Sequence, residues 1–160
     1  MGKFDSIVSE LKALINEWEP ELRSLPVKII TERINNQNRT IKQILGHLVD
    51  STSNNTHRIV HLQYQPSPFS FPNYASEGNN DRWIAIQDFQ NESWDDLVSL
   101  WKYLVLHICH VIGNIDNSRL KNEWIAGPGR HMSLEFLITE FLRHFRLHLS
   151  EIKELQTAGV

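Results

Sequence analysis

Hydrophobic residues recur three and four positions apart in four long stretches of the chain, separated by polar segments that contain proline or glycine. This periodicity is typical of amphipathic helices that pack against one another. The first stretch predicts a helix that is capped by Asp5 and ends near Glu19, because Pro20 and Pro26 follow it.

Three further helices are predicted, and each begins with a serine or threonine that can cap it. For two of them, a glutamine or aspartate three residues later completes a capping pattern. The expected helices and their caps are residues 40–64 with Thr40, residues 94–115 with Ser93, and residues 133–156 with Ser133.

The segments between these helices are expected to be irregular. Residues 66–81 contain three prolines, one glycine and several small polar residues, which is typical of a loop, and a short helical turn is expected at residues 83–89. The Gly-Pro-Gly-Arg sequence at residues 127–130 predicts a turn. No segment shows the alternation of a β-strand. The sequence therefore predicts an all-α fold, a four-helix bundle that forms a single domain over residues 1–160, with a long loop between its second and third helices.

Composition narrows the class of protein. The chain has 160 residues and a net charge of -3 with neutral histidines, and its lysines and arginines are spread along the sequence, so no nucleic-acid partner is expected. The single cysteine, Cys109, excludes an internal disulfide and is expected in the core. No signal peptide is recognisable, and no apolar stretch approaches the roughly 18 residues of a membrane span. We therefore expect a soluble, cytoplasmic protein with no membrane partner.

The second predicted helix carries a polar stripe beside its apolar face. At about 100° per residue, five polar residues fall within about 100° of one another on the helical wheel. They are His47, Asp50, Ser51, Asn54 and Arg58. His47 lies at the border between this stripe and the core. A histidine in that position is either packed and hydrogen-bonded or available as a ligand.

The last predicted helix contains His144 and His148, which are four residues apart and face inward. Together with His47, they would place three neutral imidazoles on two facing helices, and such a set can hold a divalent metal ion with one coordination position open. The spacing alone leaves two interpretations open, a metal site and three structural histidines. The other histidines are expected at the surface or in a turn: His57, His61, His107, His110 and His131.

Two segments, ILGHLVDSTSNNTHRI in the second helix and HFRLHLSEI in the last, resemble the DinB/YfiT-like superfamily of metal-dependent enzymes. The likeness extends over nearly the whole chain and includes the tryptophan-containing segment RWIAIQDFQNESWDDLVSLW. The resemblance implies a four-helix bundle of the up-down-down-up type. It also implies one divalent metal ion, zinc or nickel, held by His47, His144 and His148 and open to water or substrate. Members of the superfamily include transferases and isomerases that use a low-molecular-weight thiol.

The leading hypothesis is a metal-dependent enzyme that acts on a small-molecule substrate. A divalent ion with an open position can activate either water or a thiol, so the chain is expected to be a hydrolase or a small-thiol S-transferase. Asn54 and Arg58 could bind an anionic group of the substrate, or could form a buried polar ladder between helices. Asp50 and Glu151 are candidates for a general base or, as we favour, for groups that orient a metal-binding histidine.

The alternative is a non-catalytic helical module whose histidines are structural. Such a bundle would associate with partners through exposed apolar surface, and the tryptophan-rich third helix would provide contacts for a homodimer. A homodimer is the expected assembly under either hypothesis, because it is the commonest oligomer. Bound metal distinguishes the two hypotheses.

Overall fold

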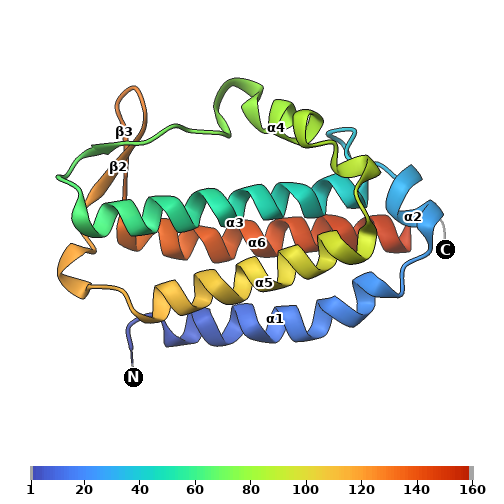
Figure 1. The fold of residues 1–160 in the computed structure, drawn as a ribbon, viewed down its shortest axis with the longest axis horizontal. Helices are drawn as coiled ribbons and strands as arrows, with labels where there is room; N and C mark the ends of the chain where they lie inside the picture. Colours follow the sequence, from blue (N-terminus) through green and yellow to red (C-terminus); the bar gives the residue numbers. More distant parts are fainter. Residues whose placement is uncertain (1, 159–160) are drawn as a thin grey trace.

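The four longest helices of the computed structural model, which describes residues 2–158, form the bundle that the sequence predicts. They are α1 (Asp5–Arg23), α3 (Ile41–Tyr64), α5 (Trp94–Gly113) and α6 (Leu134–Thr157). Figure 1 shows that α1 and α6 run in one direction and α3 and α5 in the other, which is the up-down-down-up order. Because α3 and α5 are parallel neighbours, the chain between them has to return along the length of the bundle.

Three of the four predicted caps are confirmed. Thr40 and Gln43 form a complete capping box, in which each side chain accepts a hydrogen bond from the backbone N–H of the other residue. Ser93 and Ser133 each accept a hydrogen bond from the backbone N–H three residues later. These contacts are local, which is why the sequence alone indicates where the helices begin.

The first helix differs from the prediction at both ends. Asp5 is its first residue rather than its cap, and the helix continues through Pro20 to Arg23. Proline cannot donate a hydrogen bond to the carbonyl four residues earlier. However, Leu22 is fully buried, and its carbonyl oxygen accepts a hydrogen bond of 2.9 Å from Trp94 Nε1. This packing against α5 holds the last turn and overrides the helix-breaking tendency of Pro20.

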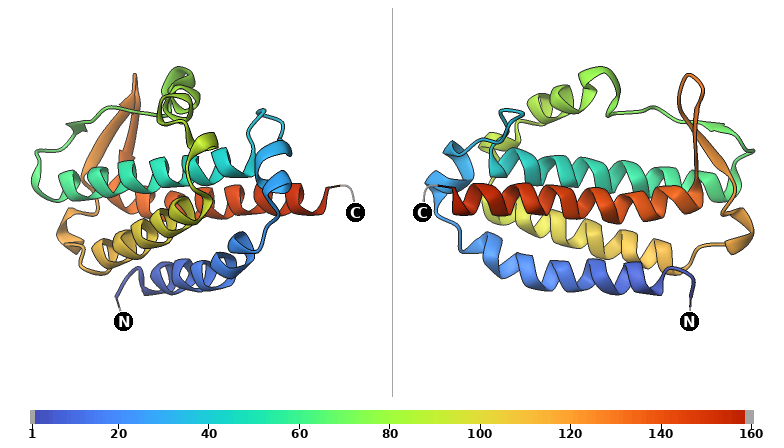
Figure 2. Two further views of the ribbon diagram at one scale, coloured as in Figure 1. Left: turned by 45° about the vertical axis from the view of Figure 1, so that its right-hand side comes forward. Right: turned by 180° about the vertical axis from the view of Figure 1, so that it is seen from behind.

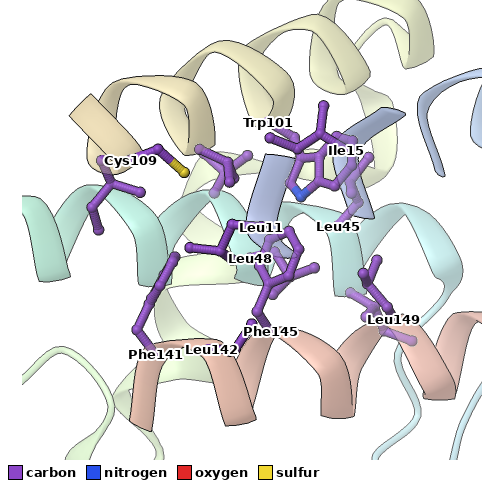
Figure 3. Close-up of a cluster of buried hydrophobic side chains, with 14 of the residues drawn as sticks. Leu11, Ile15, Leu45, Leu48, Trp101, Cys109, Phe141, Leu142, Phe145 and Leu149 are labelled. Atoms are coloured by element: carbon purple, nitrogen blue, oxygen red, sulfur yellow. The ribbon is translucent and has the colours of Figure 1, made fainter. Parts of the chain in front are cut away.

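Apolar side chains from all four long helices form the core (Figure 3). Trp101 from α5 and Phe145 from α6 are fully buried, and their rings stack with centroids 5.9 Å apart and an angle of 4° between the planes. Cys109 is buried among them, as expected, and burial raises the pKa of its thiol to about 11. The thiol is therefore protonated at neutral pH, and Cys109 is a packing residue.

A small sheet is the main feature that the sequence analysis missed. It consists of β1 (Phe69–Ser70), β2 (Glu123–Gly127) and β3 (Arg130–Ser133). The expected turn at residues 127–130 connects β2 and β3 as an antiparallel hairpin, and β1 pairs with β2 in parallel. In β2, Trp124 and Ala126 are buried between partly exposed neighbours. The sequence does not show this alternation, because the partly exposed Ile125 is apolar as well and the strand has only five residues.

The connection between α3 and α5 is more ordered than predicted. It contains β1, a 3₁₀ helix at Ser76–Gly78, the helix α4 (Asn79–Gln87) and a second 3₁₀ helix at Phe89–Asn91. The predicted helical turn is present, but it starts earlier than residue 83. Two further short helices that were not expected are α2 (Val27–Glu32) and a 3₁₀ helix at Asn117–Arg119. Figure 2 shows that α4 and the β2–β3 hairpin lie over the side of α3 that faces away from α1.

Within the described residues, one helix, α5, is long and apolar enough to cross a membrane by length and composition alone, with a mean hydropathy of 1.2 in its most apolar window. Charged residues interrupt it at Asp95, Asp96 and Lys102. In the bundle, α5 packs against both α1 and α3 and contributes Trp101 and Ile108 to the core. Its apolar character is that of a core helix.

Gly46 permits a close contact between α3 and the connection. A Cβ atom added at Gly46 would lie 2.3 Å from the ring of Phe89. By contrast, a Cβ atom added at Gly113, at the end of α5, would have no neighbour within 4 Å. The absence of a side chain at Gly46 thus lets Phe89 pack directly on the helix, one residue before His47.

We predict that Gly46→Ala lowers the free energy of unfolding by about 1–3 kcal/mol, because the added methyl group forces the Phe89 ring to move. A decrease in the free energy of unfolding is informative, because at an uncrowded helix position alanine stabilises a protein by about 1 kcal/mol relative to glycine. The control variant Gly113→Ala should therefore be neutral or stabilised. Urea unfolding of the three proteins measures these differences, and a Gly46→Ala protein as stable as the wild type would show that the contact is loose.

Candidate metal centre

Three histidine side chains from two helices meet inside the bundle. His47 comes from α3, and His144 and His148 come from successive turns of α6, which packs against α3. The Nε2 atom of His144 lies 3.4 Å from that of His47 and 3.0 Å from that of His148. One nitrogen from each ring lies within 4.8 Å of the other two. The structure thus brings together the three residues that the sequence analysis selected.

The second ring nitrogen of each histidine points away from this meeting point. His148 Nδ1 lies 2.8 Å from a carboxylate oxygen of Glu151, and His144 Nδ1 lies 3.4 Å from the Ser51 hydroxyl oxygen. His47 Nδ1 is buried without a hydrogen-bond partner among the described residues. Because Glu151 can only accept, it holds the proton of His148 on Nδ1 and leaves a lone pair on Nε2.

All three rings are neutral at pH 7. Burial is the main cause that lowers the pKa of His47 to about 2 and the pKa of His144 to about 3, and it also lowers the pKa of His148. Neutral imidazoles can direct the lone pairs of their Nε2 atoms toward one point, where a cation would accept all three. An all-imidazole donor set suits divalent transition-metal ions. The residues therefore fit a divalent transition-metal ion.

A cavity of about 360 Å³ lies beside the histidines and reaches the surface. Its walls include Ser51, Asn55 and Arg58 from α3, Tyr74 from the connection, Trp124 from β2, and His144 from α6. His47 and His148 are almost completely buried behind it. A small molecule in the cavity can therefore reach the histidine cluster from the side of His144.

The two carboxylates proposed from the sequence lie outside the walls of this cavity. Glu151 contacts His148 and, at 3.5 Å, the Asn35 side-chain amide. This position suits the expected role of orienting a histidine better than that of a general base. Asp50 accepts a hydrogen bond of 2.7 Å from Gln87 Nε2 in α4, and its other oxygen is buried without a partner among the described residues.

Of the two proposed substrate-binding residues, the structure places only Arg58 in the cavity wall. The Asn54 amide donates a hydrogen bond of 2.9 Å to the Asp50 carbonyl oxygen of its own helix. The neighbouring Asn55 lines the cavity instead, and it was not expected from the sequence, nor was Trp124. No local pattern in the sequence marks Trp124 or Asn55 as a residue of the cavity wall.

The remaining histidines lie away from the cluster. His57, His107 and His110 are exposed, as expected, and His61 is half-buried against aromatic side chains of the connection. His131 lies in β3 rather than in the turn before it, and its Nδ1 is 3.1 Å from a carboxylate oxygen of Glu123. None of these five belongs to the group of described residues that could hold a metal ion.

Burial raises the pKa of Asp50 from 3.8 to about 6, which generates a prediction for the metal-free protein. The folded state holds this proton more tightly than the unfolded chain, so the associated stability is present below about pH 4 and is lost as the pH rises through about 6. Asp50→Asn retains an acceptor for Gln87 but cannot ionise. Its stability relative to the wild type should therefore increase by about 3 kcal/mol between about pH 4 and about pH 8. Urea unfolding at both pH values tests this, and a constant difference would contradict it.

Comparison with known proteins places the fold. No protein-family model and no curated protein matches the chain. Among solved structures, the chain is similar to YfiT from Bacillus subtilis, reported as "a probable metal-dependent hydrolase with an unusual four-helix bundle topology". The two structures superpose with a TM-score of 0.80 and 15% sequence identity, over 97% of this chain and 87% of the YfiT chain. The chain therefore has the DinB/YfiT-like fold that its two histidine-containing segments indicate.

Proposed function

We propose that the protein is a metal-dependent enzyme in which His47, His144 and His148 hold one divalent ion, zinc or nickel. The observation that carries this proposal is the convergence of three neutral imidazole nitrogens inside the bundle, with Nε2 separations of 3.4 and 3.0 Å. The likeness to YfiT, reported as a probable metal-dependent hydrolase, supports the same interpretation.

A divalent ion in this position supplies a Lewis acid that activates water or a thiol at neutral pH. The residues of the chain supply the orientation. Glu151 fixes the protonated nitrogen of His148, and the Ser51 hydroxyl is placed to do the same for His144. The cavity beside His144, at about 360 Å³, is in the size range of sites that bind small molecules.

Two reaction classes suit this centre, hydrolysis of a small molecule and S-transfer with a low-molecular-weight thiol. We place hydrolysis first, because the structural similarity is to a protein reported as a hydrolase. The transferase alternative rests on the resemblance of the two histidine-containing segments to the DinB/YfiT-like superfamily, which includes thiol-dependent transferases. In both reactions the substrate would occupy the cavity beside His144.

A non-catalytic interaction module is less well supported. The tryptophans of α5 are not free to contact a partner, because Trp101 is fully buried and the Trp94 indole is hydrogen-bonded to α1. Leu100 and Tyr103 are the large apolar residues of α5 that are exposed, by 41% and 65%. A homodimer through this face of α5 stays a separate proposal, which sedimentation of the purified protein can test.

We predict that protein purified without an affinity tag contains about one divalent ion per chain, since the three imidazoles form one site. His148→Ala should remove most of this metal, because it deletes a ligand together with the contact by which Glu151 orients that ligand. His57→Ala, an exposed histidine of α3, is the matched control and should retain the metal. Elemental analysis by mass spectrometry measures the content. A wild type that stays metal-free after exposure to zinc and nickel would rule out the proposed function.

We also predict that the metal-loaded protein hydrolyses small ester or amide substrates without an added thiol. Cysteine or glutathione should then shift its melting temperature no more than their S-methyl derivatives do, which keep the carboxylates but have no free thiol. If S-transfer is the reaction, a thiol at about one hundred times its Kd would instead stabilise the folded state by about 2.7 kcal/mol. A thermal-shift series with each thiol, with His148→Ala as the control, therefore decides between the two reaction classes.

A further inference from the structure

The guanidinium group of Arg58 is a buried positive charge without a matching negative charge. Arg58 is 5% exposed, and no carboxylate among the described residues forms an ion pair with it. Its hydrogen bonds run to the side-chain oxygens of Asn55 and Asn73, at the long distances of 3.4 and 3.5 Å, and its Nε is buried without a partner. Burial of an unpaired charge is costly, so the site is complete only when an anion joins it.

Two aromatic rings determine from which direction an anion can approach. The central carbon of the guanidinium lies 3.9 Å from the centroid of the Trp124 ring and 5.5 Å from that of the Tyr74 ring. The N–H groups of a guanidinium donate in its plane, so an anion can reach them at an edge that the rings leave open. A planar carboxylate accepts two parallel hydrogen bonds from such an edge.

Charge in the surrounding walls favours an anion as well. Arg130 also borders the cavity. Glu140 is the acidic residue of the wall, and Arg143 neutralises it through an ion pair. Asn55 and Asn73 are held in place by other bonds, since their amides donate to the Ser51 and Ala126 carbonyl oxygens at 2.9 and 3.0 Å. They are neutral, so one positive charge is buried, and one carboxylate balances it better than a phosphate does.

We propose that Arg58, which lies against the rings of Trp124 and Tyr74, binds a carboxylate group of the substrate and thereby selects small carboxylic acids for the histidine centre. This inference deepens the proposed function, because Arg58 and His144 line the same cavity. It assigns Arg58 a binding role rather than a role as a structural link between α3 and β2. The reacting bond of the substrate would then lie between its carboxylate and the histidine cluster.

The test uses butyrate, its neutral isostere butyramide, and inorganic phosphate as probes. Each probe is titrated into the metal-free protein at constant ionic strength, because a carboxylate can also coordinate a metal ion. The test of Arg58 is thereby separate from the test of the metal site. Calorimetry or thermal shift should detect butyrate and not butyramide. Loss of a charge-assisted contact predicts at least about tenfold weaker butyrate binding in Arg58→Met. Arg82→Met, an exposed arginine of α4, should bind as the wild type.

A direct readout covers the case in which Arg58→Met does not fold. The Nε–H resonance of Arg58 in the wild type, assigned with the milder variant Arg58→Lys, should shift on addition of butyrate and not of butyramide. Equal binding of butyrate and butyramide, an unmoved resonance, or undiminished butyrate binding by Arg58→Met would overturn the proposal. Binding of phosphate in place of butyrate would overturn the assignment to carboxylates.

Discussion

The packing of α6 against α3 is the interaction on which the candidate centre depends, because it carries imidazoles from two helices to one point in the interior. Burial there has two effects that oppose each other. It keeps the rings neutral, so that they can act as ligands, and it removes them from water without giving each nitrogen a protein partner. In the metal-free bundle, the three buried histidines therefore lower the free energy of unfolding. A bound cation would make their contribution stabilising, since metal binding and folding are then linked.

A similar logic applies to the polar stripe along α3. Asp50 and Arg58 are both buried, yet neither forms an ion pair, and burial moves both pKa values toward the neutral form, to about 6 and about 10. A helix that served only as scaffold would be more stable with apolar residues at these positions. A stability cost of this kind would be expected if the stripe serves the proposed binding site.

The sequence predicts well what local physics determines. Capping residues and helical periodicity located the four long helices, and the same periodicity placed His47, His144 and His148 on facing surfaces. Periodicity could not predict which other helix, strand or loop packs against each side of a helix. Asn54 and Asn55 differ by about 100° on the wheel, but only the positions of the hairpin and the connection decide which of them meets the cavity. Pro20 shows the same limit, because a contact distant in sequence outweighs a local preference.

The parallel direction of α3 and α5 has a consequence for how such a protein can change. Antiparallel neighbours can be joined by a short turn, whereas this pair requires a crossover that travels the length of the molecule. Here that crossover and the β2–β3 hairpin contribute walls of the cavity, while regular helices hold the imidazoles. Surface segments accept insertions and substitutions more readily than packed helices. Selectivity can therefore diverge through the crossover and the hairpin while the reactive centre is inherited intact.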